Sequence, residues 1–141
     1  MERPDIDLHH VGYVVADMER GIRSFTREGA TVLIEPTEDP IQKVICALVG
    51  VEGEVPIELV APIDAEDSPV ASRLRRGGGM DHLCYSVDDV AAALAYEEEN
   101  GAMIVCEPVL AVTFNRMIGF AHRRSGLLIE YMGTTPIGDD G

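Results

Sequence analysis

The chain is poor in basic residues and in long apolar runs. Its 11 Lys and Arg against 25 Asp and Glu give a formal charge of −14 over 141 residues. Such a charge repels the phosphates of nucleic acids and the surfaces of anionic membranes. No segment approaches the roughly 20 consecutive apolar residues that a membrane span requires. The sequence therefore predicts neither a nucleic-acid partner nor a membrane partner.

Cysteine is scarce as well. Cys46, Cys84 and Cys106 form an odd set without a CxxC spacing, which argues against a disulfide framework and against a structural zinc knuckle. Reduced thiols are typical of the cytoplasm. The first residues show neither the basic region nor the apolar run of a secretory signal. We therefore expect a cytoplasmic protein, and the length suits a single domain.

What the chain does contain is an internal repeat with an offset of 72 residues. Residues 9–60 align without gaps with residues 81–132. Identical pairs include Tyr13/Tyr85, Asp17/Asp89, Gly29/Gly101, Pro36/Pro108 and, near the two ends of each copy, His10/His82 and Glu58/Glu130. A chain that repeats itself once is best interpreted as two copies of one supersecondary unit.

Each copy predicts the element order β-α-β-β-β. β-favouring residues and turn signals predict four strands in each copy, at 8–15, 30–34, 41–49 and 55–61 and again at 82–87, 102–106, 114–121 and 127–132. Asp17 and Asp89 are suited to cap a helix in each copy, and Gly29 and Gly101 to end it. Because neither copy can bury its sheet alone, we predict an α+β fold. In this fold, two βαβββ repeats form a curved eight-stranded sheet around a cavity.

The single domain divides into two units and their connections. We place unit one at 6–61, a linker at 62–80, unit two at 81–132 and a disordered tail at 133–141. Ser68 and Pro69 predict a short helix within the linker.

The candidate functional residues are the His and Glu that close each copy. Glu58 follows His10 by 48 residues, and Glu130 follows His82 by the same number. A lone histidine in an apolar strand is usually structural, but ionised carboxylates are rarely buried unless they are paired or bind a metal. Two imidazoles and two carboxylates form a plausible octahedral site for one divalent ion, which we take to be Co, Mn, Ni, Zn, Fe or Mg. We therefore expect the cavity to bind a metal.

The sequence resembles the vicinal oxygen chelate superfamily and, within it, the methylmalonyl-CoA epimerases. The resemblance covers roughly residues 7–132 and rests on the stretches LHHVGYVVADMERGI, IELVAPIDAEDSPVASRL, GGGMDHLCYSVDDVAAAL and GLLIEYM. It implies paired βαβββ units and a metal bound by the four residues just named. It also implies an isomerase that stabilises an enolate, and a homodimer. An acyl-CoA or another 1,3-dicarbonyl compound is the expected substrate.

Two residues are candidates for proton transfer. Glu130 is the first, as a metal ligand that also carries protons. Lys43 is the second, because a lysine in an otherwise apolar strand can be desolvated and act as a base. Its alternative is an ordinary solvent-facing lysine. The basic clusters Arg73, Arg75, Arg76 and Arg123–Arg124 could hold a carboxylate or phosphate of the substrate, although a solvated face is the default.

Other functions stay open because the sequence departs from the epimerase pattern. The loop at 111–116 and the residues after it lack the family's Gly-x-x-Gly and His-Pro-Lys motifs, and Gln42 and Val44 flank Lys43 where some epimerases carry a second acidic residue. One alternative is another metal enzyme of the superfamily, such as a lyase or cyclase of a biosynthetic pathway. The other is a non-catalytic protein that binds a small molecule such as an antibiotic.

Overall fold

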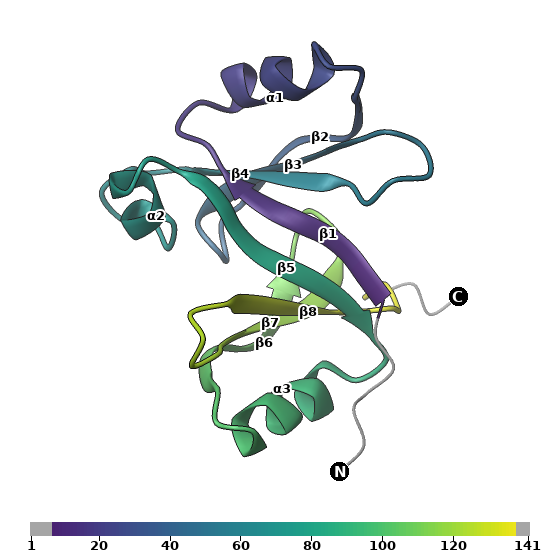
Figure 1. Ribbon diagram of the computed structural model, residues 1–141, viewed down its shortest axis with the longest axis vertical. Coiled ribbons are helices and arrows are strands. Elements are labelled where there is room, and N and C mark those ends of the chain that lie inside the picture. Colours follow the sequence, from purple (N-terminus) through teal and green to yellow (C-terminus); the bar gives the residue numbers. More distant parts are fainter. Residues whose placement is uncertain (1–6, 138–141) are drawn as a thin grey trace. The chain divides into compact units, whose positions relative to one another are not determined.

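A computed structural model describes residues 7–137, and these residues form two compact units. Among the described residues, the first unit comprises residues 10–81, and the second comprises residues 82–137 together with residues 7–9. The elements along the first half are β1 (Asp7–Val14), α1 (Met18–Thr26), β2 (Thr31–Asp39), β3 (Val44–Gly50), β4 (Ile57–Pro62) and α2 (Ala71–Arg75). They are followed by β5 (Gly79–Val87), α3 (Val90–Glu99), β6 (Met103–Ala111), β7 (Arg116–His122) and β8 (Leu128–Gly133) (Figure 1).

The two units have the same internal topology. In the first unit β1 pairs in parallel with β4, and β4, β3 and β2 follow one another as antiparallel neighbours. In the second unit β5 pairs in parallel with β8, and β8, β7 and β6 are antiparallel neighbours. The predicted βαβββ order is therefore confirmed in both copies.

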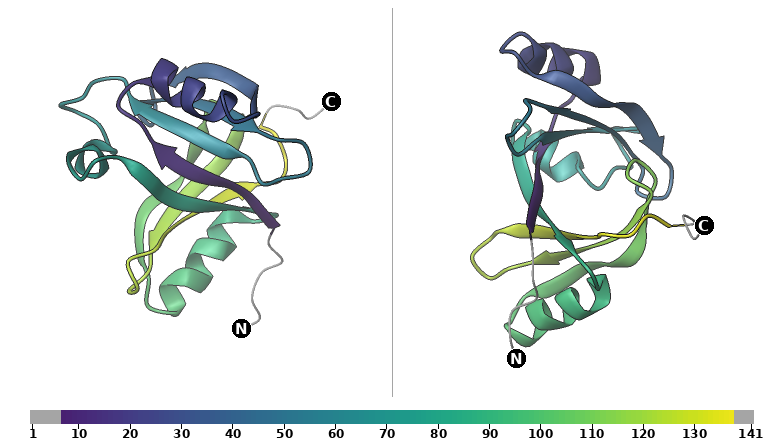
Figure 2. Two further views of the ribbon diagram at one scale, coloured as in Figure 1. Left: turned by 45° about the horizontal axis from the view of Figure 1, so that its top comes forward. Right: turned by 90° about the vertical axis from the view of Figure 1, so that its right-hand side faces the viewer.

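One helix covers one face of the strands in each unit (Figure 2). α1 contacts β2, β3 and β4, and α3 contacts β6, β7 and β8. The predicted caps are confirmed, because Asp17 accepts a hydrogen bond from the Arg20 backbone N–H and Asp89 accepts one from Ala92, each at 3.0 Å. No helix among residues 7–137 is long and apolar enough to cross a membrane.

Two strands run past the ends that the sequence predicts for them, at residues 34 and 106. β2 continues through Pro36 to Asp39, and β6 continues through Pro108 to Ala111. The pairing register shifts between Ile34 and Thr37 in β2, and likewise in β6. The proline, which has no N–H to donate, therefore falls in an irregularity of an outer strand. The predicted strands at 30–34 and 102–106 were therefore too short, because the outer strands continue past their prolines.

The end of the chain is ordered further than the predicted boundary at residue 133. Gly133 completes β8, and the Thr134 N–H donates to the Val87 carbonyl at 3.0 Å. The Ile137 N–H donates to the Asn115 carbonyl at 2.8 Å, and the Asn115 side chain donates to the Ile137 carbonyl at 2.7 Å. The rest of the predicted tail, residues 138–141, lies outside the described residues.

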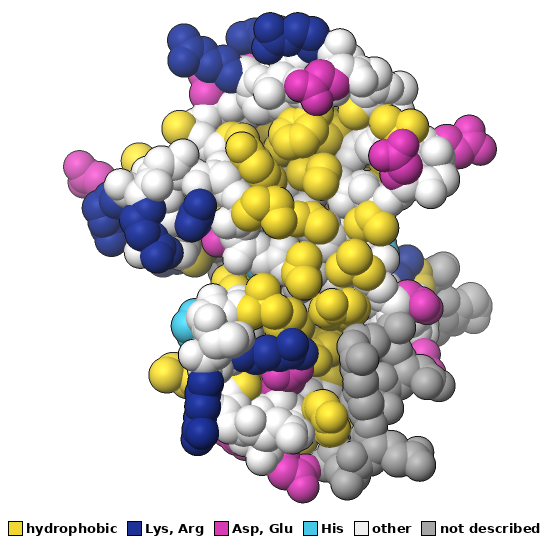
Figure 3. Space-filling model, viewed as in Figure 1, with side chains coloured by type: hydrophobic (Ala, Val, Ile, Leu, Met, Phe, Trp, Pro, Cys, Tyr) yellow, Lys and Arg dark blue, Asp and Glu magenta, His cyan; other side chains and the backbone are white. Residues whose placement is uncertain are grey.

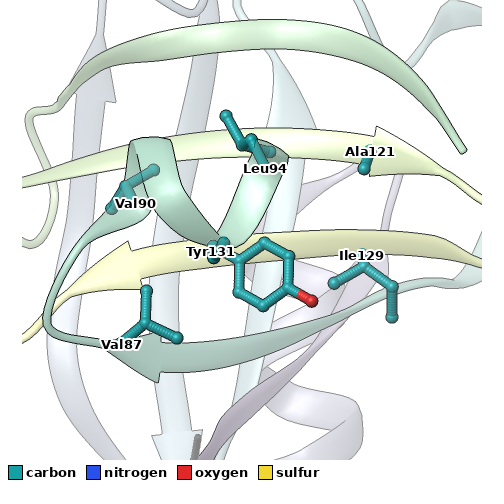
Figure 4. Packing of buried hydrophobic residues seen from close by; sticks show 7 residues of the cluster. Val87, Val90, Leu94, Ala121, Ile129 and Tyr131 are labelled. Carbon is teal, nitrogen blue, oxygen red and sulfur yellow. The ribbon is translucent and has the colours of Figure 1, made fainter. Parts of the chain in front are cut away.

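The core of the second unit lies between α3 and the strands beneath it. Figure 4 shows the buried side chains that meet there, Val87, Val90, Leu94, Ala121, Ile129 and Tyr131. Ile129 and Tyr131 alternate with Glu130 along β8, so the helix-covered face is the one opposite to Glu130. Packing on this face leaves the other face of β8 to the functional residues.

Removing a side chain from this core should destabilise the protein strongly. Leu94 is 3% exposed, so we expect Leu94→Ala to lower the free energy of unfolding by about 2–5 kcal/mol through lost burial and a residual cavity. Leu33, on β2, is 53% exposed, and the same substitution there should cost less than about 1 kcal/mol. Chemical denaturation of both variants makes the measurement. Equal losses would contradict the assigned core.

Candidate functional site

The first unit places His10 beside Glu58 on neighbouring parallel strands. β1 and β4 pair with Gly12 opposite Glu58, and His10 lies two residues before Gly12 on the same face. Nε2 of His10 lies 3.4 Å from Oε1 of Glu58. Both residues are buried, with exposed fractions of 0% and 5%. An imidazole and a carboxylate thus face each other where water is largely excluded.

The second unit repeats this arrangement. β5 and β8 pair with Cys84 opposite Glu130, and His82 precedes Cys84 by two residues. Nε2 of His82 lies 3.1 Å from Oε1 of Glu130, and both residues are buried. The edge of the Phe120 ring meets the His82 ring, with centroids 5.3 Å apart. The structure therefore brings His10 to Glu58 and His82 to Glu130, as the sequence repeat predicts.

The chemistry of each pair suits a divalent metal. Imidazole nitrogen and carboxylate oxygen are ligands for Mn, Fe, Co, Ni or Zn. Two neighbouring ligand atoms that each lie about 2.1 Å from one ion are roughly 3 Å apart at right angles. The separations of 3.4 Å and 3.1 Å in the two pairs are close to this value. Each pair therefore fits two adjacent ligand positions of one ion.

Cys84, Phe120 and Cys106 surround Glu130 in the second unit. Phe120 pairs with Glu130 on one side and with Cys106 on the other, so the three share one row across the sheet. Burial, then the charges of Glu130 and Glu107, raise the pKa of the Cys106 thiol. The thiol accordingly stays neutral at physiological pH. Sequence reasoning missed Phe120 and Cys106, because only the register of β6 and β7 places them beside Glu130.

Lys43 does not lie in an apolar strand. β3 begins at Val44, and Lys43 is an exposed turn residue with a φ of 61°. Its ammonium pairs with Asp67 at 2.9 Å. The turn is built around the buried Asp39 carboxylate, which accepts hydrogen bonds from the backbone of Ile41 and Gln42. The predicted role of Lys43 as a base requires that its side chain be removed from water. The exposed position of Lys43 does not meet this requirement.

A buried polar network lies on the face of β8 that is opposite to Glu130. Both carboxylate oxygens of Glu97, on α3, accept hydrogen bonds from Arg123, at 3.0 and 2.8 Å. The Tyr131 hydroxyl donates to the same carboxylate. Burial, followed by the hydrogen bond to Glu97, raises the pKa of Tyr131 well above its ordinary value. Tyr131 is next to Glu130 in the chain, so the network holds the strand that carries Glu130.

This network belongs to the second unit alone. The repeat offset of 72 residues places Phe25, Val51 and Leu59 at the matching positions of the first unit. Phe25 packs edge-on against Tyr13 there, with ring centroids 5.5 Å apart. The fold of one unit therefore does not require the polar network. Its presence distinguishes the strand that carries Glu130 from the strand that carries Glu58.

The raised pKa of Tyr131 predicts a specific loss of stability in alkali. The unfolded chain releases the tyrosine proton above about pH 10, whereas the folded protein retains it to a higher pH. The free energy of unfolding should therefore fall as the pH rises above about pH 10, by up to about 1.4 kcal/mol per pH unit. Tyr131→Phe should lack this contribution. Denaturant titrations of both proteins between about pH 8 and about pH 11 provide the comparison, and parallel curves would refute it.

Comparison with known proteins places this geometry in context. A family model described as Glyoxalase/Bleomycin resistance protein/Dioxygenase superfamily matches residues 9–120. The ethylmalonyl-CoA/methylmalonyl-CoA epimerase of Cereibacter sphaeroides is 30% identical over 129 residues, which cover 87% of this chain and 94% of that protein. The human mitochondrial methylmalonyl-CoA epimerase is 28% identical, over 87% of this chain and 71% of its own.

A solved structure is also similar. The methylmalonyl-CoA epimerase of Mycobacterium tuberculosis superposes with a TM-score of 0.79 and 30% identity, over 92% of this chain and 88% of that one. Similarity of this extent covers both βαβββ copies and the segment between them. The predicted glyoxalase-like α+β fold is thereby confirmed.

Proposed function

We propose that this chain, which belongs to the glyoxalase/bleomycin resistance protein/dioxygenase superfamily, is a metal-dependent epimerase of an α-branched malonyl-CoA thioester. The relatives confirm the predicted family and the isomerase class. The proposed substrate class follows from the activities named for them. The observation that carries the proposal is the buried His–Glu pair that recurs in the two units.

In this proposal His10, Glu58, His82 and Glu130 together hold one divalent ion, which is Co, Mn, Ni, Zn, Fe or Mg. The argument is chemical, because each pair supplies one nitrogen and one oxygen ligand, and a dication offsets the two buried carboxylates, one from each unit. The two pairs together supply four ligands. The remaining coordination positions of the ion are then available to oxygens of the substrate. When bound, such an ion stabilises the negative charge that develops on those oxygens.

Glu130 is the residue we propose to move the proton. Its carboxylate is 3% exposed and lies beside Phe120 and Cys84, which exclude water from it. A carboxylate in such surroundings can accept the α-proton of a bound thioester. The configuration at that carbon inverts when a second group delivers a proton to the opposite face of the resulting enolate. The role of Lys43 as the second proton donor stays a prediction. It requires that the Lys43 ammonium first separate from the Asp67 carboxylate.

We also propose that the protein acts as a cytoplasmic homodimer on this small-molecule substrate. Support for the compartment comes from Cys46, Cys84 and Cys106, none of which forms a disulfide within residues 7–137. Support for the dimer comes from the resemblance to the superfamily, whose folds often pair.

The test of the proposed function is hydrogen exchange at the reacting carbon. The metal-loaded protein, incubated with methylmalonyl-CoA in deuterated water, should place deuterium at the α-carbon while the two configurations equilibrate. Glu130→Gln should reduce the exchange rate by about 10²-fold or more, because the amide cannot accept the proton. Glu107→Gln, at an exposed glutamate of β6, is the control and should keep the rate.

Mass spectrometry and NMR of the recovered thioester measure both processes. No deuterium uptake by the unaltered protein, with methylmalonyl-CoA or with ethylmalonyl-CoA, would reject this function. Equal rates in the Glu130→Gln and Glu107→Gln variants would reject the role of Glu130.

A further inference from the structure

The short helix α2 covers part of the strand face that carries Glu58. Val60 pairs with Cys46 on one side and with Val14 on the other, in the row next to that of Glu58. Val70 and Leu74 pack against this row. Adjacent rows on one face are two residues apart along the strand, or about 7 Å. The segment around α2 therefore borders the His10–Glu58 pair within the first unit.

A close backbone contact fixes the end of α2. The Arg73 side chain donates a hydrogen bond to the Gly78 carbonyl at 2.8 Å, and the Gly78 N–H donates to the Arg73 carbonyl at 2.9 Å. Gly78 has a φ of 75°, and a Cβ there would lie 2.8 Å from the carbonyl oxygen of Val14. Only glycine fits this position. Arg73 thus ties the end of α2 to Gly78, the glycine that lies close to the Val14 carbonyl of β1.

The next two arginines are differently placed. Arg75 and Arg76 are exposed, and neither forms a salt bridge within the described residues 7–137. Figure 3 shows the group of basic side chains over α2. On a chain with a formal charge of −14, two unpaired guanidinium groups beside the Glu58 face are a local exception. Arginine is well suited to bind phosphate through paired hydrogen bonds.

We infer that Arg75 and Arg76 bind the phosphate groups of the nucleotide that carries the acyl group. This inference rests on the proposed function, in which the substrate is a CoA thioester. Such a substrate is a polyanion that the net charge of the protein repels, so its phosphates need a local cationic site. A long flexible arm joins these phosphates to the thioester, which allows them to bind at the border of the site while the acyl group reaches the metal ligands.

A second row of arginines provides a matched control. Arg20, Arg23 and Arg27 follow one another at helical spacing along α1 and its C-terminal end, and all three are exposed. α1 packs on the other face of the strands, because Phe25 contacts Tyr13, which alternates with Gly12 and Val14. Substituting Arg23 and Arg27 removes the same charge as substituting Arg75 and Arg76, but on the face away from Glu58.

The experiment measures binding of adenosine 3′,5′-bisphosphate, the phosphate-bearing end of CoA, by isothermal titration calorimetry. The unaltered protein should bind it, and the double variant R75A/R76A should bind it at least about tenfold more weakly. The double variant R23A/R27A should stay within about twofold of the unaltered protein. Circular dichroism and thermal unfolding of each variant establish that α2 and the rest of the fold are retained.

Three outcomes would overturn the inference. They are no binding by the unaltered protein, equal Kd values in all three proteins, and equal weakening by the two double variants, which would indicate a general effect of charge. Because the ligand carries no acyl group, this result is independent of the deuterium exchange that tests the proposed function. If the exchange is found, KM for the full thioester should rise about tenfold in R75A/R76A. KM for the pantetheine thioester, which lacks the nucleotide, should change less than twofold.

Discussion

Burial of a carboxylate against an imidazole, once in each unit, is the constraint around which this structure is built. A glutamate in the middle of an apolar strand is costly unless a charge or a metal compensates it. Glu58 and Glu130 both occupy such positions, and each faces a histidine on the neighbouring parallel strand. The parallel pairing of the first and last strands of each βαβββ unit is what brings the two residues together. The helix of each unit covers the other face, so the core and the candidate site use opposite sides of the same strands.

The two units satisfy this common constraint with different surroundings. In the first unit the reverse face of β4 carries apolar residues, and a helix with exposed arginines borders the face of Glu58. In the second unit the carboxylate of Glu97 binds Tyr131 and Arg123 behind Glu130. A duplicated unit that keeps its His–Glu pair but changes what lies around it is consistent with divided roles. Under the two proposals made above, the first unit binds the carrier and the second transfers the proton.

Much of this organisation is predictable from the sequence because a repeat constrains it twice. The offset of 72 residues identified both His–Glu pairs, and Asp17, Asp89 and the glycines that end each helix gave the order of elements.

Predictions from the local sequence failed where the pairing between strands determines the structure. The strands predicted at 30–34 and 102–106 continue past Pro36 and Pro108, because outer strands accept a proline at a shift of register. Lys43 was assigned to a strand because its neighbours are apolar, whereas the Asp39 carboxylate organises a turn there. Phe120, Cys106 and the Glu97 network depend on cross-strand register, which composition and spacing do not show.

The most direct test of the central claim is the metal content of the protein after purification without a metal-affinity tag, beside Glu58→Ala and His82→Ala. These substitutions remove one ligand from each unit. If both pairs hold one ion, the unaltered protein contains about one divalent ion per chain, and either substitution removes nearly all of it while the fold is retained. His122→Ala, at an exposed histidine, should keep the ion. Two ions per chain, with one lost in each variant, would show separate sites, and an unaltered protein that neither contains nor takes up a divalent ion would contradict the account.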